Sequence, residues 1–185
     1  MRVITGKARG VTLKTPDGMQ TRPTTDRVKE ALFSIIQFEI QGANVLDLFG
    51  GTGQLGIEAL SRGAKRAVFV DFQANACRLI RENLKRARLD GDAQVVQSDY
   101  LAYLDRCKEK FQIVFLDPPY AEVFLETALK RITEIDILQS GGIIVCERPL
   151  GKELFCDLPG YSRSKDYKYG KTLLTLYRKN DMPDK

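Results

Sequence analysis

Short apolar runs that end at a carboxylate recur through the middle of this sequence and constrain its fold more than any other feature. Residues 45–48, 67–70, 94–97 and 113–116 form such runs, and helical periodicity fills the intervals between them. Strands that alternate with helices form βαβ units, which build a mostly parallel sheet covered on both faces. Ligands of such sheets bind at the carboxyl ends of the strands. The first candidate site residues are therefore the acids at those ends: Asp47, Asp71, Asp99 and Asp117.

Further elements extend this α/β pattern toward the C-terminus. Glycine and turn residues separate each element from the next, as expected for short connections. Helices are expected over residues 54–62, from about residue 72 to residue 87, and over residues 123–132. Strands are expected over residues 143–146, 161–167 and 172–177, with the last two joined by a tight connection.

The first 42 residues are expected to form a small extension of the main domain. Residues 2–5 and 11–15 have the pattern of a β-hairpin, and turn residues follow them. An apolar stripe then predicts a helix over residues 26–38, with Thr24, Thr25 and Asp26 as N-cap candidates. The expected organisation is thus a hairpin and capping helix at 1–42, the main domain at 43–179 and a tail at 180–185.

A glycine-rich segment follows the first run of the main domain. Gly51, Gly53 and Gly56 satisfy the GxGxxG pattern between a predicted strand and a predicted helix, and Asp71 follows twenty residues after Gly51. In dinucleotide-binding sites such glycines let the backbone approach the ligand closely, and the acid binds the ribose hydroxyls. A turn without a ligand can also use glycines, but the strand, the helix and the acid together favour an adenosine-containing cofactor.

Two features favour S-adenosylmethionine over NAD as this cofactor. Asp47 lies three residues before the glycine run, where its carboxylate would repel a pyrophosphate and attract a sulfonium and an ammonium group. The chain of 185 residues also leaves little room for a nicotinamide half and a separate substrate domain. The sequence therefore predicts S-adenosylmethionine.

Asp117, Pro118, Pro119 and Tyr120 directly follow another apolar run. Two prolines can simply end a strand, because they cannot continue its hydrogen bonding. This tetrapeptide also suits an exocyclic amine of a nucleobase, whose lone pair is delocalised into the ring. The Asp117 carboxylate and the Pro118 carbonyl can each accept one N–H and direct the lone pair out of the base plane. Tyr120 then offers a ring for stacking.

The charge distribution indicates a polyanionic partner. The net charge is +5, with seven Lys and Arg against four Asp and Glu in residues 1–44, and eight against three in residues 148–179. The residues between carry thirteen against fifteen. Basic ends around a mildly acidic body fit an RNA-binding face, although a charge run is often only a solvated surface.

The remaining composition excludes several classes of protein. There is no histidine, and the four cysteines are far apart, which excludes a zinc finger and His-dependent catalysis and disfavours a disulfide framework. No run is long and apolar enough to span a membrane, and the start does not have the pattern of a secretory signal. We expect a cytoplasmic, metal-free protein.

The motifs resemble a known family. DLFGGTGQLGIEALSRGA, VFVD and LDPPY, in this order, are similar to class I, seven-stranded S-adenosylmethionine-dependent methyltransferases. VITGKARGVTL and RPTTDRVKEALFSII resemble specifically the RsmD-type guanine-N2 methyltransferases of bacterial 16S ribosomal RNA, and the resemblance covers residues 2–179. It implies a Rossmann-like sheet, a methyltransferase domain at 43–179, and 16S rRNA in an assembling or assembled small subunit as substrate. We expect a monomer.

The site residues expected from these arguments fall into three groups. The catalytic group is Asp117, Pro118, Pro119 and Tyr120. The resemblance implies cofactor contacts by Asp47, Phe49, Gly50, Gly51, Thr52, Gly53, Asp71 and Asp99, and the helix entry adds Thr25 and Arg27. Expected RNA contacts are Arg22, Arg27, Lys165, Lys168 and Lys171.

Three alternatives remain open from the sequence. Adenine-N6 methyltransferases of DNA also use the DPPY motif, although this chain leaves little room for a domain that reads DNA sequence. A non-catalytic module that keeps the fold and binds RNA would have no use for a motif that orients an amine. An NAD-dependent oxidoreductase is the third alternative.

Overall fold

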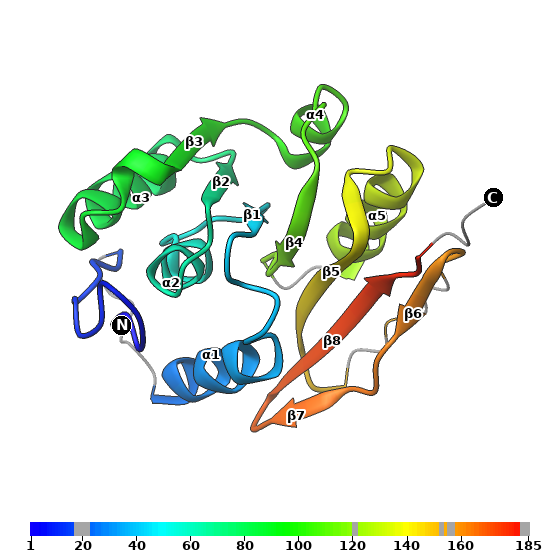
Figure 1. Ribbon diagram of the computed structural model, residues 1–185, viewed down its shortest axis with the longest axis horizontal. Helices are drawn as coiled ribbons and strands as arrows, with labels where there is room; N and C mark the ends of the chain where they lie inside the picture. The colour runs from blue at the N-terminus through cyan, green and yellow to red at the C-terminus, as the bar shows by residue number, and fades with distance from the viewer. Residues whose placement is uncertain (17–22, 120–121, 152–153, 155–157, 182–185) are drawn as a thin grey trace.

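The computed structural model describes residues 1–16, 23–119, 122–151, 154 and 158–181. Its strands are β1 Asn44–Asp47, β2 Arg66–Asp71, β3 Ala93–Gln97, β4 Phe111–Leu116, β5 Leu138–Pro149, β6 Tyr161–Arg163, β7 Tyr167–Tyr169 and β8 Thr172–Lys179. They form one sheet in the order β3-β2-β1-β4-β5-β8-β6, and β7 also pairs with β8 (Figure 1). Strands β1 to β5 run parallel and β8 is antiparallel to β5. The predicted α/β fold with a mostly parallel sheet is confirmed.

Helices cover both faces of this sheet. They are α1 Pro23–Ile35, α2 Gln54–Ser61, α3 Ala74–Ala87, α4 Tyr100–Leu104 and α5 Glu122–Glu134, with a short 3-10 turn at Asp90–Asp92. α1, α2 and α3 contribute to one hydrophobic core, and α4 and α5 to the other. Successive strand residues alternate between the two cores, as Val45 and Leu46 do in β1. Burial on both faces explains why these strands are continuous apolar runs.

The first helix starts earlier than its sequence pattern predicts. α1 begins at Pro23, so the expectation that Thr24, Thr25 and Asp26 supply its N-cap is wrong, because all three lie within its first turn. Proline suits the first helical position because the amide hydrogen that it lacks has no helical partner there. The helix ends at Ile35, whereas the prediction extended it to Phe38, whose side chain is 88% exposed.

The predicted N-terminal hairpin is wrong as a regular two-stranded ribbon. Arg2 and Thr12 form a single antiparallel bridge, although the N–H of Val3 still donates to Val11 across the loop. The amides of Ile4 and Thr5 turn instead toward the Glu58 side chain of α2. The segment is therefore a loop that packs on α2, and its apolar residues share a core with the sheet.

The end of the chain also differs from its prediction. The strand expected over residues 161–167 is two short strands, β6 and β7, which pair with successive parts of β8. The sheet therefore has eight strands where the resemblance implied seven. α4 was not predicted, because its five residues are too few for a periodic pattern. Among the described residues, no helix is long and apolar enough to cross a membrane.

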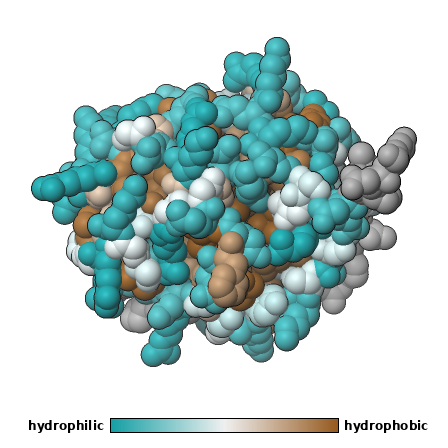
Figure 2. Space-filling view, viewed as in Figure 1, coloured by the Kyte–Doolittle hydropathy of each residue, from teal (hydrophilic) through white to brown (hydrophobic). Residues whose placement is uncertain are grey.

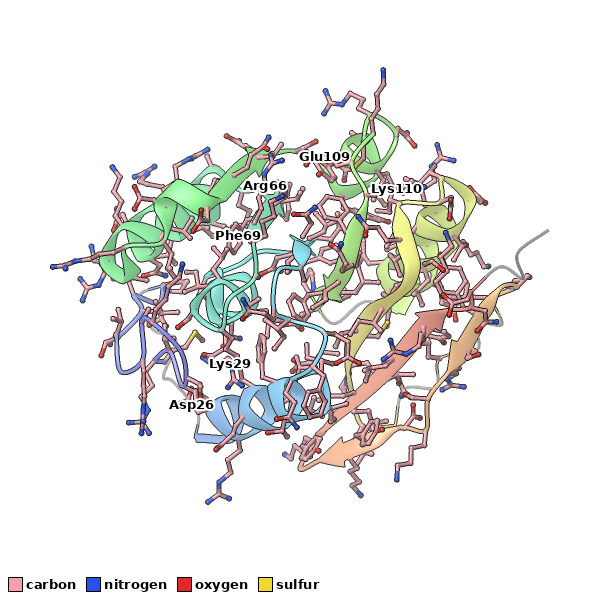
Figure 3. All side chains as sticks on the ribbon, viewed as in Figure 1. Asp26, Lys29, Arg66, Phe69, Glu109 and Lys110 are labelled. Carbon is pink, nitrogen blue, oxygen red and sulfur yellow. The ribbon has the colours of Figure 1, made fainter. Side chains whose placement is uncertain are left out.

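A buried carboxylate joins the N-terminal segment to the main domain. Glu58 of α2 is fully buried, and it accepts the amides of Ile4 and Thr5 at 2.8 and 3.0 Å. Its oxygens also lie 2.8 Å from Arg62 Nε and 3.5 Å from Lys29 Nζ. Lys29 extends from α1 into the interior (Figure 3), where it donates to the Arg2 carbonyl and where burial lowers its pKa.

Replacement of Glu58 by glutamine should destabilise the fold strongly. The Glu58→Gln variant would leave the buried Lys29 ammonium without its counter-charge, which typically costs about 3–5 kcal/mol. Urea unfolding followed by circular dichroism measures this loss. The matched control is Glu82→Gln, which breaks the exposed pair between Lys14 and Glu82. Equal stability of the two variants would contradict the role of Glu58.

Candidate active site

The carboxyl ends of three adjacent strands bring acids together on one face of the sheet. Asp47 ends β1 opposite Phe115, Asp117 directly follows β4, and Glu147 lies near the end of β5. Each acid comes two residues after a side chain of the core that contains α1 and α2, namely Val45, Phe115 and Val145. Because side chains alternate along a strand, the three acids share that face. The predicted grouping at the strand ends is present for Asp47 and Asp117, and Glu147 joins them.

Asp47 lies under the first turn of α2. Its Oδ2 accepts the Gly56 amide at 3.2 Å, and its side chain is almost wholly buried. Burial raises the pKa of Asp47 to about 8, and the nearby Asp117 and Asp71 add to the effect. Such a group is neutral in the empty site near pH 7, and a bound cation would favour its charged form.

The glycine loop follows Asp47 and has the backbone geometry that its residues permit. Gly51 and Gly53 have φ of 55° and 79°, a left-handed conformation that glycine adopts without strain. The amide of Gly50 donates to the Val70 carbonyl at 2.8 Å, which ties the loop to β2. Thr52 is partly buried beside it, and its carbonyl accepts from Asn83 of α3.

Gly56 has a different function from the two loop glycines. A Cβ at this position would lie 2.3 Å from the Phe69 ring of β2, so only glycine lets α2 pack this closely on the sheet. Figure 3 labels Phe69, which lies on β2 in the interior of the molecule. The GxGxxG pattern therefore combines two turn glycines with one packing glycine.

Asp71 and Asp99 follow the outer strands and bind backbone amides. Asp71 ends β2, and its two oxygens accept the amides of Gly51 and Gln73, both at 2.9 Å. This contact places the acid directly against the glycine loop, as the twenty-residue spacing predicted. Asp99 is the N-cap of α4, where its Oδ1 accepts from Leu101 and Ala102. Its exposed position beyond β3 leaves it at the sheet edge that bears the other acids.

An aromatic cluster lines the other side of the loop. The Phe49 ring lies 5.2 Å from the Tyr100 ring of α4, and Tyr100 lies 5.7 Å from Phe124 of α5. Tyr100 and Phe124 were missed by the sequence reasoning, because neither belongs to a motif. Phe49 is thus held between the loop and the helices on the far face of the sheet.

Asp117 is partly buried, and burial raises its pKa to about 6. Pro118 and Pro119 continue the chain from it, while Tyr120 lies outside the described residues. Glu147 was missed, although the run before it ends in a carboxylate like the other runs. Burial, together with the negative charge of Asp117, raises the pKa of Glu147 to about 8. Among the described residues, no cluster of acids and cysteines could hold a metal ion.

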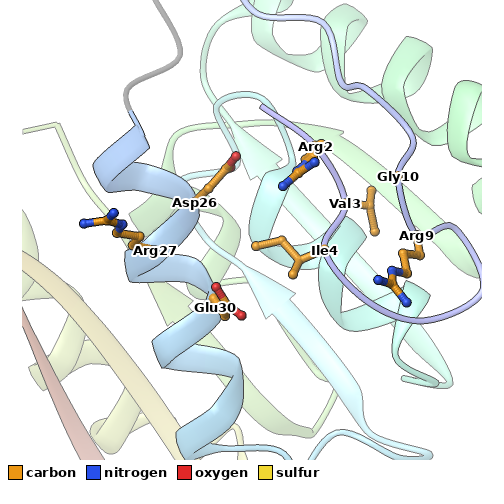
Figure 4. Close-up of a pocket in the computed structure, with 8 residues that line it drawn as sticks. All are labelled: Arg2, Val3, Ile4, Arg9, Gly10, Asp26, Arg27 and Glu30. Atoms are coloured by element: carbon orange, nitrogen blue, oxygen red, sulfur yellow. The ribbon is translucent and has the colours of Figure 1, made fainter.

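The expected RNA contacts lie on two parts of the surface. Arg27 of α1 is exposed and helps to line a pocket of about 460 Å³ between α1 and the N-terminal loop. In Figure 4, Asp26 points toward Arg2 across this pocket, whereas Arg27 points to the opposite side of α1. Arg22 and the side chain of Thr25 lie outside the described part of the structure. The exposed lysines of the C-terminal hairpin are Lys165, Lys168 and Lys171.

Comparisons with known proteins identify the family. The family model described as "Conserved hypothetical protein 95" matches residues 1–178. The ribosomal RNA small subunit methyltransferase D of Escherichia coli K12 is 32% identical over 97% of this chain and 90% of its own. YlbH of Bacillus subtilis, named by inference as an rRNA methyltransferase, is 40% identical over 97% of this chain and 99% of its own. This chain belongs to the ribosomal RNA small subunit methyltransferase D family.

The solved structures agree with this membership. The Escherichia coli protein yhhF, described by inference as a methyltransferase, superposes with a TM-score of 0.88 at 30% identity, over 97% of this chain and 98% of its own. The predictions of the family, of an RNA methyltransferase and of S-adenosylmethionine as its cofactor are confirmed. The alternative of an NAD-dependent oxidoreductase is excluded. The roles of individual residues in this family member stay predictions.

Replacement of Asp47 by asparagine should stabilise the empty protein while weakening cofactor binding. The pKa of Asp47 is about 8 in the folded protein and near 3.9 in the unfolded chain, so the folded state binds one more proton between these pH values. The free energy of unfolding of the wild type therefore falls as the pH rises from about 4 to about 8. The free energy of unfolding of Asp47→Asn, relative to that of the wild type, should therefore increase from pH 5 to pH 8 by more than about 1 kcal/mol. Urea unfolding at both pH values measures it, with exposed Asp90→Asn as control. If the stability difference between Asp47→Asn and the wild type were the same at pH 5 and pH 8, the raised pKa of Asp47 would be contradicted.

Proposed function

We propose that this enzyme transfers the methyl group of S-adenosylmethionine to the exocyclic N2 amine of a guanine in 16S ribosomal RNA. The observation that carries the proposal is the position of Asp117 and Pro118, which follow β4 beside the acid at the end of β1. The name of its Escherichia coli relative supports a small-subunit substrate. We propose further that the substrate is the small subunit or its assembly intermediate in the cytoplasm, and that the enzyme acts as a monomer.

The glycine loop and the acids around it fit the cofactor. Asp47 is buried beside two other carboxylates, and its raised pKa reflects a site that favours a cationic ligand such as a sulfonium or an ammonium group. We assign the ribose hydroxyls to Asp71, whose carboxylate lies against the glycine loop and accepts the Gly51 amide. We assign the adenine amine to Asp99, and we propose that Thr25 and Arg27 cover the cofactor site. The cofactor supplies an electrophilic methyl group.

The residues after β4 would prepare the guanine amine for reaction. The Asp117 carboxylate and the Pro118 carbonyl would each accept one N–H, which directs the nitrogen lone pair out of the base plane. Proline limits the backbone rotation that would turn this carbonyl away. Asp117 is also placed to accept the proton that the amine loses once it is methylated. Tyr120 would stack on the base, and most of the rate gain would come from the placement of two reactants.

The direct test is to incubate the enzyme with labelled S-adenosylmethionine and unmodified small subunits, free rRNA, tRNA or DNA, and then to identify the methylated nucleoside. We expect N2-methylguanosine from the small subunit. The matched variant Asp117→Ala should lose most of the transfer rate while it binds the cofactor as tightly as the wild type does. Label in N6-methyladenine would overturn the proposal in favour of an adenine methyltransferase. Binding of RNA without transfer would favour a non-catalytic module.

The C-terminal hairpin is the proposed rim of the RNA site. Tyr167 of β7 aligns with Leu174 of β8, which aligns with Glu147 of β5, so β7 lies two strand spacings, or about 10 Å, from the proposed pocket. Lys165 Nζ lies 5.5 Å above the Tyr167 ring, at the outer edge of this sheet. We propose that phosphates contact Lys165, Lys168 and Lys171, with Arg22 and Arg27 on the opposite rim. These contacts would offset the cost of taking the base out of its stack.

Replacement of Lys165, Lys168 and Lys171 together by glutamine should make RNA binding less sensitive to salt. Each phosphate contact to single-stranded RNA contributes a slope of about −0.7 in log affinity against log salt, so three lost contacts should flatten it by about two units. Filter binding of RNA over a salt series measures the slope. The affinity for S-adenosylmethionine should not change. An unaltered slope would mean that these lysines form only a solvated surface.

A further inference from the structure

Glu147 is a half-buried acid that the reaction described so far does not use. Cys146 pairs with Leu116 in the parallel register of β5 and β4, so Glu147 and Asp117 occupy the next positions of two adjacent strands. Adjacent strands lie about 4.8 Å apart, and the two side chains share one face. The two carboxylates are therefore neighbours in the pocket that the proposed function assigns to the base.

Among the described residues, only burial and the negative charge of Asp117 act on the pKa of Glu147, so no basic group there supplies a counter-charge. Its neighbour on the other side is Leu174 of β8, an apolar side chain that is wholly buried. In the part of the chain that the structure describes, no hydrogen-bond donor contacts the carboxylate of Glu147 or that of Asp117. Among the described residues, two half-buried carboxylates without a hydrogen-bond donor thus lie side by side, an arrangement that a ligand with N–H donors would stabilise.

We propose that Glu147 is a specificity-determining contact for the target base, whose carboxylate accepts the N1–H of the guanine while Asp117 holds the N2 amine. The inference rests on the proposed function and assigns the reading of guanine to this one residue. On guanine, N1–H and the N2 amine are adjacent donors on the Watson–Crick edge, and flipped bases are read by contacts to that edge. Two adjacent carboxylates match two adjacent donors.

Adenine does not match the same pair of acids. Beside its N6 amine, N1 carries a lone pair, which would face the Glu147 carboxylate and repel it. The pair therefore explains how a motif shared with adenine enzymes can select guanine: Asp117 holds an amine of either base, and Glu147 distinguishes the neighbouring ring nitrogen. The raised pKa of Glu147 fits this role, because two N–H donors would favour ionisation of an acid that is neutral in the empty site.

The test compares two bases at the methylated position, once that position has been mapped. RNA segments that carry guanine or 2-aminopurine there are ligated into 16S rRNA and assembled into small subunits. 2-Aminopurine keeps the 2-amino group but has a lone pair at N1. The wild type should methylate guanine at least 10-fold faster, measured as kcat/KM. The Glu147→Gln variant should lose roughly 10-fold on guanine, because a charge-assisted hydrogen bond is about twice as strong as a neutral one.

The same variant should not lose rate on 2-aminopurine, since the glutamine amide can donate to N1, and the preference for guanine should therefore collapse. Glu147→Asp should keep the preference at a lower rate, which guards against a folding defect in the first variant. Glu134→Gln, which breaks an exposed pair with Arg131, is the matched control and should behave as the wild type does. Cofactor affinity should not change in any variant.

An unchanged ratio of guanine to 2-aminopurine in Glu147→Gln would overturn the inference while the proposed function stands. A wild type that places no methyl group on guanine N2 in any particle would overturn the proposed function itself. A Glu147→Gln variant that gains activity on adenine at the same position would support the inference, because its amide can donate to the adenine N1.

Discussion

The buried carboxylate of Glu58 is the interaction on which the arrangement of this molecule depends. Through it α2, which carries the end of the glycine loop, also binds the N-terminal segment and the Lys29 ammonium of α1. Burial of an ion pair costs free energy, because both charges lose their hydration. The pair persists here because the backbone amides of Ile4 and Thr5 and the Arg62 side chain also donate hydrogen bonds to the Glu58 oxygens. α2 therefore follows the glycine loop at its first turn and, through Glu58, also binds the N-terminal segment and α1. The face seen in Figure 2 is mostly hydrophilic, in keeping with charges that otherwise lie outside.

The active site arises from strand register more than from any single motif. Parallel pairing of β1, β4 and β5 places the residues after each strand at one edge of the sheet. Three acids from segments 30 or more residues apart in the chain then share a partly buried space, and their mutual repulsion adds to the effect of burial. In the proposed function, a cationic cofactor and a base with N–H donors are the ligands that would stabilise this cluster of acids.

Periodicity was enough to predict the central sheet, at whose edge Asp47 and Asp117 lie, whereas the binding of a ligand there stays a prediction. β1, β2 and β4 have strong patterns, because burial on both faces selects apolar residues at most of their positions, whereas β3 is only partly buried and contains two glutamines. The N-terminal hairpin keeps its predicted antiparallel pairing but does not form regular strands, since its amides bind Glu58, a side chain distant in sequence that local patterns cannot reveal. Tyr100 was not predicted as a site residue for a similar reason, because its ring packs on Phe49 only in the folded chain. Glu147 could have been found, as its strand ends like the others.

The division of the last edge strand into β6 and β7 affects how the molecule meets other chains. Between them, Ser164 and Asp166 turn their side chains to Leu176, Thr175 and Arg148, so backbone pairing is interrupted after three residues. A long unpaired edge would invite a strand of another protein to add to the sheet, whereas two short strands that expose Arg163 and Lys168 do not. This protects a concentrated protein from aggregation through that edge. It also leaves the lysines free to meet a polyanion there.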